Sequence, residues 1–318
     1  MYSFHKARLC RVFFYRACYA HRMSRRLLSA IALPVVMLPS AGYPDSRLPS
    51  LQHERLTEAS GLASSRQFEG LYWAINDGGS PPELFLLGPD GGDHGTVAVA
   101  GAENVDWEDL ASFVLDGRNW LLIADIGDND ARRDAVTLYV VEEPTVADAH
   151  SAEVSWRIDF AYPDGAQDAE AVAVDAVQER ILVLSKRRVP AVLYAIPLRP
   201  PTSPVIADAV GDVTTIEQPT RADIDRAPLA DDWHWQPTGM DLAPDGAVIL
   251  TYDSIWYFRR RPGTDPFATF QSEPLRFRLD GVPGAEAVAF DRAGDAIVVT
   301  AENENAPIIV MRIPDRAR

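Results

Sequence analysis

The segment EAVAFDRAGDAIVVTAENENAPIIVMRI, residues 286–313, shows the local architecture most clearly. An acidic residue begins a short apolar run, and a turn rich in Asp and Gly follows at 291–295. A second apolar run at 296–300, a polar loop and a third apolar run at 308–313 complete the segment. Runs of five or six residues rich in β-branched side chains, bounded by turn residues, indicate strands and not helices. The segment is therefore predicted to form three antiparallel strands.

The same succession occurs five times along the chain, which indicates a repeat architecture. The copies begin at Glu58-Ala-Ser-Gly-Leu62, Glu108-Asp-Leu-Ala-Ser112, Glu170-Ala-Val-Ala-Val174, Thr238-Gly-Met-Asp-Leu242 and Glu286-Ala-Val-Ala-Phe290. Outer fourth strands are predicted at Thr96–Ala100, Val154–Phe160, Val213–Ile216 and Ala268–Phe277. Successive four-stranded antiparallel units predict an all-β fold, a β-propeller.

Five blades are favoured, and a sixth blade would have to lie in the stretch Arg199–Gln236, which is rich in Pro and Asp. The last copy ends without a fourth strand. The segment Leu51–Leu56 precedes the first copy and is predicted to pair beside Ile308–Ile313. The ring of blades would then be closed by its N- and C-terminal strands.

The charge of the chain is strongly negative. Its 318 residues include 30 Lys and Arg against 46 Asp and Glu, a formal net charge of −16. Residues 1–44 hold seven bases and no acid, so residues 45–318 carry 23 bases against 46 acids, or −23. Such a body repels a phosphate backbone, which argues against a nucleic-acid partner. The hydrophobic content of 47% is typical of a globular protein.

Residues 23–42 have the layout of a secretory signal peptide. The pair Arg25-Arg26 precedes the apolar stretch Leu27–Leu38, and the small residues Ser40–Gly42 precede a cleavage point. The twelve apolar residues are too few to span a bilayer of about 30 Å. Export is therefore predicted, with no stable membrane span after cleavage.

The remaining chain divides into an upstream extension, 1–22, and one propeller domain, 43–318. The extension is consistent with a misassigned start codon. Both cysteines, Cys10 and Cys18, lie in it. A mature chain without cysteine fits the periplasm or the external medium, where stray thiols are oxidised.

Two motifs resemble those of a known group of proteins. They are Trp107-Glu-Asp-Leu110 and Ile123-Ala-Asp-Ile-Gly-Asp-Asn129. With the repeats, which cover nearly all of residues 50–314, they resemble exported bacterial propellers of the SdiA-regulated, NHL-repeat and phytase-esterase-like grouping. The resemblance implies a propeller fold and not one reaction, because this fold hosts unrelated functions.

Acidic residues are expected to gather at one end of the ring. In an antiparallel unit, the start of the first strand and the end of the second lie at the same edge. The metal ligands predicted there are Glu58, Asp77, Glu108, Asp125, Glu170, Asp253, Glu286 and Glu302. Asp106 and Asp168 are expected at the same mouth. Crowded carboxylates repel one another unless a cation intervenes, and oxygen ligands with no cysteine suit Ca²⁺ rather than zinc.

A structural role for the repeated glutamates stays open at this point. A Glu at the head of an inner strand can accept hydrogen bonds from the neighbouring blade and so hold the ring together. Thr238 replaces Glu in the fourth copy, so the set of carboxylates is incomplete. The acidic loop 125–130 lacks the glycine and the final Glu of an EF-hand.

Basic and aromatic residues near the same mouth are candidates for ligand binding. Arg132, Arg133, Lys186 and Arg187 could clamp a phosphate or carboxylate beside a metal, or could be solvated loop tips.

The segment Trp233-His234-Trp235 could stack on a sugar or a cationic ligand, or pack at a blade edge. His234 is the weak candidate for a general base. The partner would then be a small molecule, a sugar or a protein ligand at the propeller face.

Two classes of function remain open. The chain has no Gly-x-Ser-x-Gly elbow, no Walker loop, no His-Glu-x-x-His and no dinucleotide fingerprint. A non-catalytic binding propeller with an acidic, Ca²⁺-loaded channel mouth is favoured. The alternative is a Ca²⁺-dependent hydrolase of an ester, lactone or phosphoester. Whether the protein is an enzyme stays open, because no pair of base and nucleophile can be named.

Overall fold

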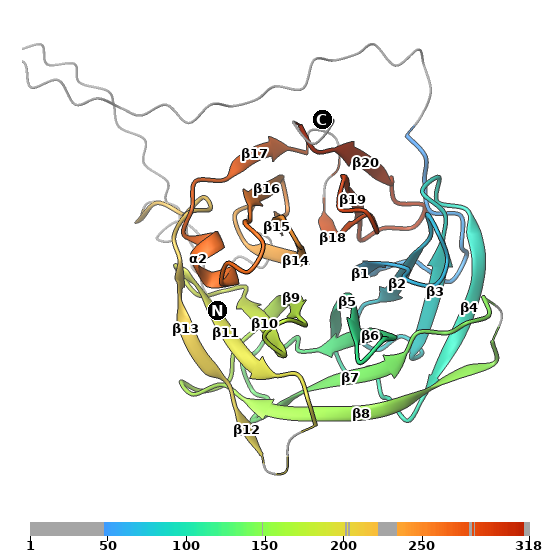
Figure 1. The fold of residues 1–318 in the computed structure, drawn as a ribbon, viewed down its shortest axis with the longest axis horizontal. Coiled ribbons are helices and arrows are strands. Elements are labelled where there is room, and N and C mark those ends of the chain that lie inside the picture. The colour runs from blue at the N-terminus through green and yellow to red at the C-terminus, as the bar shows by residue number, and fades with distance from the viewer. Residues whose placement is uncertain are drawn as a thin grey trace, which may run out of the picture. The chain divides into compact units, whose positions relative to one another are not determined.

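Strands make up most of the described protein. The computed structural model describes residues 48–147, 149–200, 202, 204–221, 234–279, 282 and 284–314. These residues form an all-β, propeller-like arrangement of antiparallel strands with one short helix (Figure 1). The predicted extension, the signal peptide and Trp233 lie outside the described residues.

The first two modules are each four antiparallel strands. The first consists of β1 (Ala59–Ser64), β2 (Tyr72–Asn76), β3 (Glu83–Leu87) and β4 (Asp93–Ala100). The second consists of β5 (Trp107–Leu115), β6 (Arg118–Asp125), β7 (Val136–Glu142) and β8 (Ser151–Ala161). Parallel pairing of β4 with β8 joins the two modules, and β12 (Val205–Ile206) adds to β8.

The other three modules follow the same antiparallel plan. The third has β9 (Ala169–Asp175), β10 (Arg180–Ser185), β11 (Ala191–Pro197) and β13 (Asp208–Val213). The fourth has β14 (Pro237–Ala243), β15 (Gly246–Thr251), β16 (Ser254–Arg259) and β17 (Leu275–Arg278). The fifth has three strands: β18 (Ala285–Phe290), β19 (Ala296–Ala301) and β20 (Ile309–Arg312).

The first three strands of every copy are confirmed, whereas the outer strands deviate in two copies. In the third, β13 ends at Val213 instead of beginning there. In the fourth, the expected strand Ala268–Phe277 is the helix α2 (Pro266–Phe270) followed by β17. Asp265 caps this helix by accepting from the amide of Phe267 at 2.9 Å. In the part of the chain that the structure describes, no helix is long and apolar enough to cross a membrane.

The first strand of each module faces the centre. Contacts run from β1 to β5, β9, β14 and β18 in order, and from β18 back to β1 (Figure 1). Side chains of neighbouring modules pack together, and Trp73 of β2 and Trp107 of β5 are fully buried in the core that the first two modules share. Burial of this kind contributes roughly 1.5–3 kcal/mol per large apolar side chain.

A buried carboxylate, Asp109, ties three of the first strands together. Its oxygens accept from the amides of Leu110 at 2.8 Å in β5, Val172 at 2.7 Å in β9 and Met240 at 3.3 Å in β14. Asp241 joins β14 to β18 in the same manner, accepting from the Phe290 amide at 2.8 Å. The centre is therefore held by acids that are supplied with backbone donors.

The two ends of the described chain meet beside the fifth module. Ser50 and Pro307 form an antiparallel bridge, and the Leu51 amide donates to the Ala306 carbonyl at 2.9 Å. The predicted strand at Leu51–Leu56 is wrong, because the Gln52 amide already bonds to Gly91 of the first module at 3.0 Å. The segment thus leaves the fifth module after one bridge. Leu51 and Leu56 are nevertheless buried in the core that the first, fourth and fifth modules share.

Candidate functional site

A pocket of about 360 Å³ lies where first strands begin and second strands end. Its lining residues are Asp77, Glu108, Asn129, Asp130, Glu170, Lys186, Tyr252, Glu286 and Glu302. Five of the eight predicted metal ligands are among them. For these five residues, the prediction that they gather at one edge of the modules is confirmed. Two larger hollows, of about 810 and 620 Å³, lie at the opposite edge of the modules. Among the described residues, neither holds a group of acids placed for a metal ion.

A β-bulge occurs near the start of every first strand. The extra residues are Ser60 in β1, Glu108 in β5, Glu170 in β9, Thr238 in β14 and Glu286 in β18. A bulge re-aims the side chain that it carries. In the first copy, the residue equivalent to these glutamates is therefore Ser60. The comparison of the five repeats had predicted Glu58 for this position.

The five bulge residues divide into two chemical types. Ser60 donates its hydroxyl hydrogen to the Trp107 carbonyl at 2.9 Å, and Thr238 donates to the Ala285 carbonyl at 2.8 Å. Both hydroxyls thus join their module to the next one. The three glutamates line the pocket instead. The stitching role considered for the repeated Glu is performed by the hydroxyl residues.

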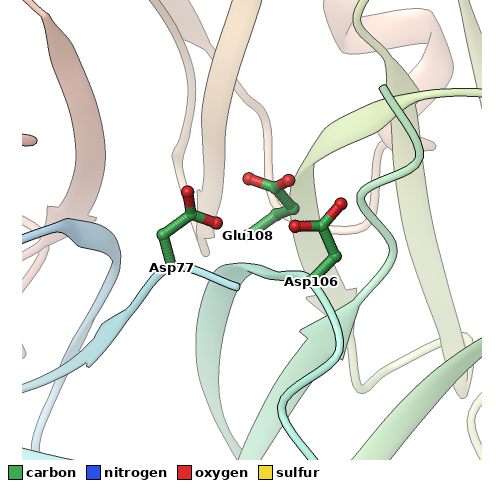
Figure 2. A group of neighbouring side chains, drawn as sticks. All are labelled: Asp77, Asp106 and Glu108. Carbon is green, nitrogen blue, oxygen red and sulfur yellow. The ribbon is translucent and has the colours of Figure 1, made fainter. Parts of the chain in front are cut away.

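Three carboxylates from the first two modules converge in the pocket region. Asp77 follows β2, while Asp106 and Glu108 lie at the start of β5, and their ligand oxygens lie within 4.8 Å of one another (Figure 2). Glu108 is 7% exposed. Within the described chain, no side chain or amide donates to Glu108, and the three acids form no salt bridge. We call Asp77, Asp106 and Glu108 the acidic triad.

The electrostatics of the acidic triad favour a cation. Burial and the neighbouring Asp77 raise the pKa of Asp106 to about 6. Burial and the carboxylates of Glu170 and Asp77 raise the pKa of Glu108 well above its usual range. Burial also raises the pKa of Asp77. Ionising all three groups is costly unless a positive charge compensates them.

Two glycines leave room for these carboxylates. A Cβ on Gly127 would lie 2.1 Å from Glu108 Oε1 and 2.4 Å from Asp106 Oδ2. A Cβ on Gly78 would lie 2.3 Å from Asp106 Oδ1. Both glycines belong to loops that follow second strands. At both positions the backbone lies so close to the carboxylates of the triad that any side chain larger than that of glycine would clash with them.

A second, overlapping group of acids is already neutralised. Glu108, Asp168 and Glu170 also bring ligand oxygens within 4.8 Å of one another. Lys186, however, forms a buried salt bridge with Glu170, and Arg187 Nε donates to Asp168 Oδ2 at 2.6 Å. Two bases thus offset two of these three carboxylates. The acidic triad, which forms no salt bridge in the described chain, is therefore the stronger candidate for a metal site.

Glu286 and Glu302 form a carboxyl pair on the other side of the pocket. Glu286 donates a hydrogen bond to Glu302. Burial, followed by the carboxylates of Glu170 and Glu302, raises the pKa of Glu286 to about 10. Neither residue forms a salt bridge within the described chain.

Three predicted metal ligands lie outside the pocket. Asp125 is buried against Arg133 at 2.7 Å. Asp253 faces Arg276 and Arg278, at 3.5 and 3.4 Å. Glu58 is exposed and lies two residues before the bulge. Asp125 and Asp253 are thus paired with arginines, and Glu58 faces solvent. None of the three lies with the acidic triad in the pocket lining.

The predicted ligand-binding bases are mostly engaged with acids. Arg133 donates to the Gly127 carbonyl at 2.8 Å as well as pairing with Asp125. Arg132 pairs with Asp130 at 3.1 Å and is largely exposed. Arg187 joins Asp168 to Asn129. Of the four predicted bases, only Lys186 lines the pocket.

The aromatic and histidine candidates also lie away from the pocket lining. His234 lies 3.6 Å from Glu217 and is half exposed, and Trp235 is buried. Tyr252, by contrast, lines the pocket and was not predicted. The signal was available, because Tyr252 directly follows β15, as Asp77, Lys186 and Glu302 follow the second strands of other modules.

The chain is similar to several solved structures at low sequence identity. No family model matches the chain, and no curated protein matches it. The major allergen Mala s 1 of Malassezia sympodialis is 11% identical over 85% of this chain and 83% of its own, with a TM-score of 0.44. The Pan2 WD40 domain of Neurospora crassa is 12% identical over 84% of this chain and 67% of its own, with a TM-score of 0.36.

Raptor of Chaetomium thermophilum is 12% identical over 80% of this chain, with a TM-score of 0.35. This chain spans about a fifth, 20%, of the Raptor chain. At such scores the likenesses carry no information about function.

Proposed function

We propose that the chain is an exported, five-bladed β-propeller that binds a ligand or partner at its acidic pocket, with Ca²⁺ held by the acidic triad. The cyclic contacts of the five first strands support five blades. In the described part of 199–236, β12 joins β8 and β13 joins the third module, which leaves no strands there for a sixth. The bridge between Ser50 and Pro307 supports closure of the ring through the terminal segments.

Export is the part of the proposal that rests on sequence alone. Its support is the arrangement of Arg25-Arg26, Leu27–Leu38 and Ser40–Gly42. The protein would then act in the periplasm or the external medium. Free Ca²⁺ at millimolar levels is sufficient there for the weaker class of extracellular sites.

One observation carries the cation: Glu108 is a buried carboxylate without a donor, placed against Asp77 and Asp106 (Figure 2). Ionising a buried carboxylate that has no partner is expensive, and a cation would offset that cost when Glu108 ionises. Three carboxylates supply up to six oxygens, and Ca²⁺ takes six to eight at about 2.3–2.6 Å with water completing the shell. Oxygen-only ligands suit this hard ion.

Binding is favoured over hydrolysis by the composition of the pocket. Among the described residues, no histidine lines it, and Lys186 is paired with Glu170. His234, the predicted general base, lies beside Glu217 instead. A Ca²⁺-dependent hydrolase would therefore have to use carboxyl groups or Tyr252 as acid and base. The ligand is a small molecule, sugar or protein segment that enters beside the metal.

The proposal is tested by thermal unfolding of the purified protein with increasing Ca²⁺. Binding to the native state adds about 2.7 kcal/mol at 100 times Kd, so Tm should rise with concentration. Glu108→Gln should abolish the rise while the metal-free protein stays folded. Glu58→Gln is the matched control, since Glu58 is exposed outside the pocket, and it should keep the rise. An unchanged Tm at millimolar Ca²⁺ in the wild type would overturn the proposal.

A further inference from the structure

The side of the pocket opposite the acidic triad is built by the third, fourth and fifth modules. Its residues are Glu170, Lys186, Tyr252, Glu286 and Glu302. Across the whole pocket, six carboxyl side chains face one lysine. A single Ca²⁺ at the triad leaves the carboxylates in excess. An anionic ligand would be repelled by such a lining, whereas a cationic one would be concentrated in it.

Lys186 shows which cation this side accommodates. Its ammonium group forms a buried salt bridge with Glu170 and lies 5.4 Å from the centre of the Tyr252 ring. It also donates a hydrogen bond to the Tyr252 hydroxyl. A carboxylate and an aromatic face are the two groups that recognise an alkylammonium ion in proteins. The chain's own side chain thus occupies one ammonium position.

Glu286 and Glu302 line the pocket next to that position, and they share one proton, so the pair carries one negative charge. Their hydrogen bond to each other is the only one either side chain makes in the described protein, and no base pairs with them. Glu286 lies close enough to Tyr252 and Glu170 to interact with both electrostatically. Independently, Glu108 in the same pocket is nine-tenths buried without a donor. The pocket is therefore short of cationic partners on both sides.

We infer that this side of the pocket binds the ammonium group of a small aliphatic amine, held by Glu286 and Glu302 beside the Tyr252 ring. This assignment rests on the proposed function, because it takes the acidic pocket as the ligand site. The volume of about 360 Å³ lies in the range of pockets for small molecules. A linear polyamine places one ammonium group at the pair and extends its chain toward the opening.

Calorimetric titration with spermidine, in saturating Ca²⁺ and in a chelator, tests the inference. Spermidine should bind, and triethylene glycol, an uncharged chain of similar length, should not. Glu302→Gln and Glu286→Gln should each weaken spermidine binding at least tenfold. Glu69→Gln removes one exposed charge at the opposite edge of the modules and should leave the affinity within about twofold.

The variants separate this inference from the Ca²⁺ site. Glu302→Gln should keep the Ca²⁺-dependent rise in Tm, and Glu108→Gln should lose that rise but still bind spermidine. A wild type that binds Ca²⁺ but not spermidine would overturn the amine assignment alone. Equal weakening by Glu69→Gln and Glu302→Gln would overturn it too, because spermidine would then be attracted only by the general negative charge of the protein.

A second probe distinguishes the source of the amine. Acetylated trilysine carries the same ammonium groups on a peptide. If it binds more tightly than spermidine, the ligand is a lysine side chain of a protein, and the assignment to a small amine is wrong. Lys186→Met should free Glu170 for an external ammonium group, so spermidine should raise the Tm of this variant more than that of the wild type.

Discussion

Glu108 and Asp109 are neighbours in β5, and both are buried carboxylates, with 7% and 0% of their surfaces exposed. Asp109 accepts hydrogen bonds from three backbone amides on three first strands. Glu108 sits on the bulge and has no donor among the described residues. The difference teaches that burial alone does not distinguish a structural acid from a binding acid. The supply of donors does.

The largest effect is expected for Asp109→Ala. Loss of the carboxylate leaves the amides of Leu110, Val172 and Met240 without this acceptor, and each unsatisfied buried amide costs about 1–3 kcal/mol. The free energy of unfolding should fall by about 3–5 kcal/mol in urea with chelator present. Glu108→Ala, one residue away, is the matched control and should change it by less than about 1 kcal/mol. Equal losses in both variants would remove the distinction.

Asp241 has two amide donors, between the three of Asp109 and the absence of any for Glu108 in the described chain, and its contribution to stability is expected to depend on pH. Its carboxylate accepts from the amides of Leu242 and Phe290, at 2.7 and 2.8 Å. Burial nevertheless raises its pKa to about 6. Because the folded state holds the proton more tightly than the unfolded state, this contribution to stability is present below about pH 4. It is lost as the pH rises through about 6.

The expected loss from Asp241 is up to about 3 kcal/mol across that range. Asp241→Asn cannot ionise and should show a smaller decrease in unfolding free energy between pH 4 and 7, measured in urea with chelator. Glu54→Gln, at an exposed position, should follow the wild-type curve. If the unfolding free energy of Asp241→Asn falls as steeply with pH as that of the wild type, the prediction is wrong. The two amide hydrogen bonds would then fully compensate the cost of burying the Asp241 charge.

Much of the fold could be predicted from the sequence, because its strands are short apolar runs bounded by Gly, Asp and Pro. The run 296–300 and its turn at 291–295 are examples, and β19 occupies almost the same residues. The outer strands were less predictable. Residues 266–270 form a helix because Asp265 and Pro266 provide an N-cap and a first helical residue, a local signal that the repeat pattern obscured.

The site was predicted only in part, for a reason that lies in the register. Periodicity of two places strand residues on faces, but it cannot reveal a bulge, which shifts the register by one. Glu58 was aligned with Glu108 because both are acidic, although Ser60, two residues further along, occupies the bulge in β1. The sequence could not reveal tertiary partners either. Asp125 ends β6 and Asp77 directly follows β2, yet of these two only Asp125 has an arginine beside it among the described residues.

The smallest effect concerns the hydroxyl bulges. Ser60 and Thr238 each donate one hydrogen bond to a carbonyl of the next module, at 2.9 and 2.8 Å. Such a bond contributes about 1 kcal/mol net, so Ser60→Ala and Thr238→Val should each lower the unfolding free energy by that amount. Neither hydroxyl lines the pocket, so the rise of Tm with Ca²⁺ should be unchanged in both variants.

Glu108→Gln should give the reverse pattern on an equivalent bulge: unchanged stability without metal and no response to Ca²⁺. The double variant Ser60→Ala/Thr238→Val separates the two uses further. Ser60 and Thr238 stitch different pairs of modules, β1 to β5 and β14 to β18, so their losses should add within about 0.5 kcal/mol. A double variant that also loses the Ca²⁺ response would mean that stitching and metal binding are coupled through the ring. The five bulges would then act together in linking the modules and in binding Ca²⁺, rather than each bulge having only one of these two roles.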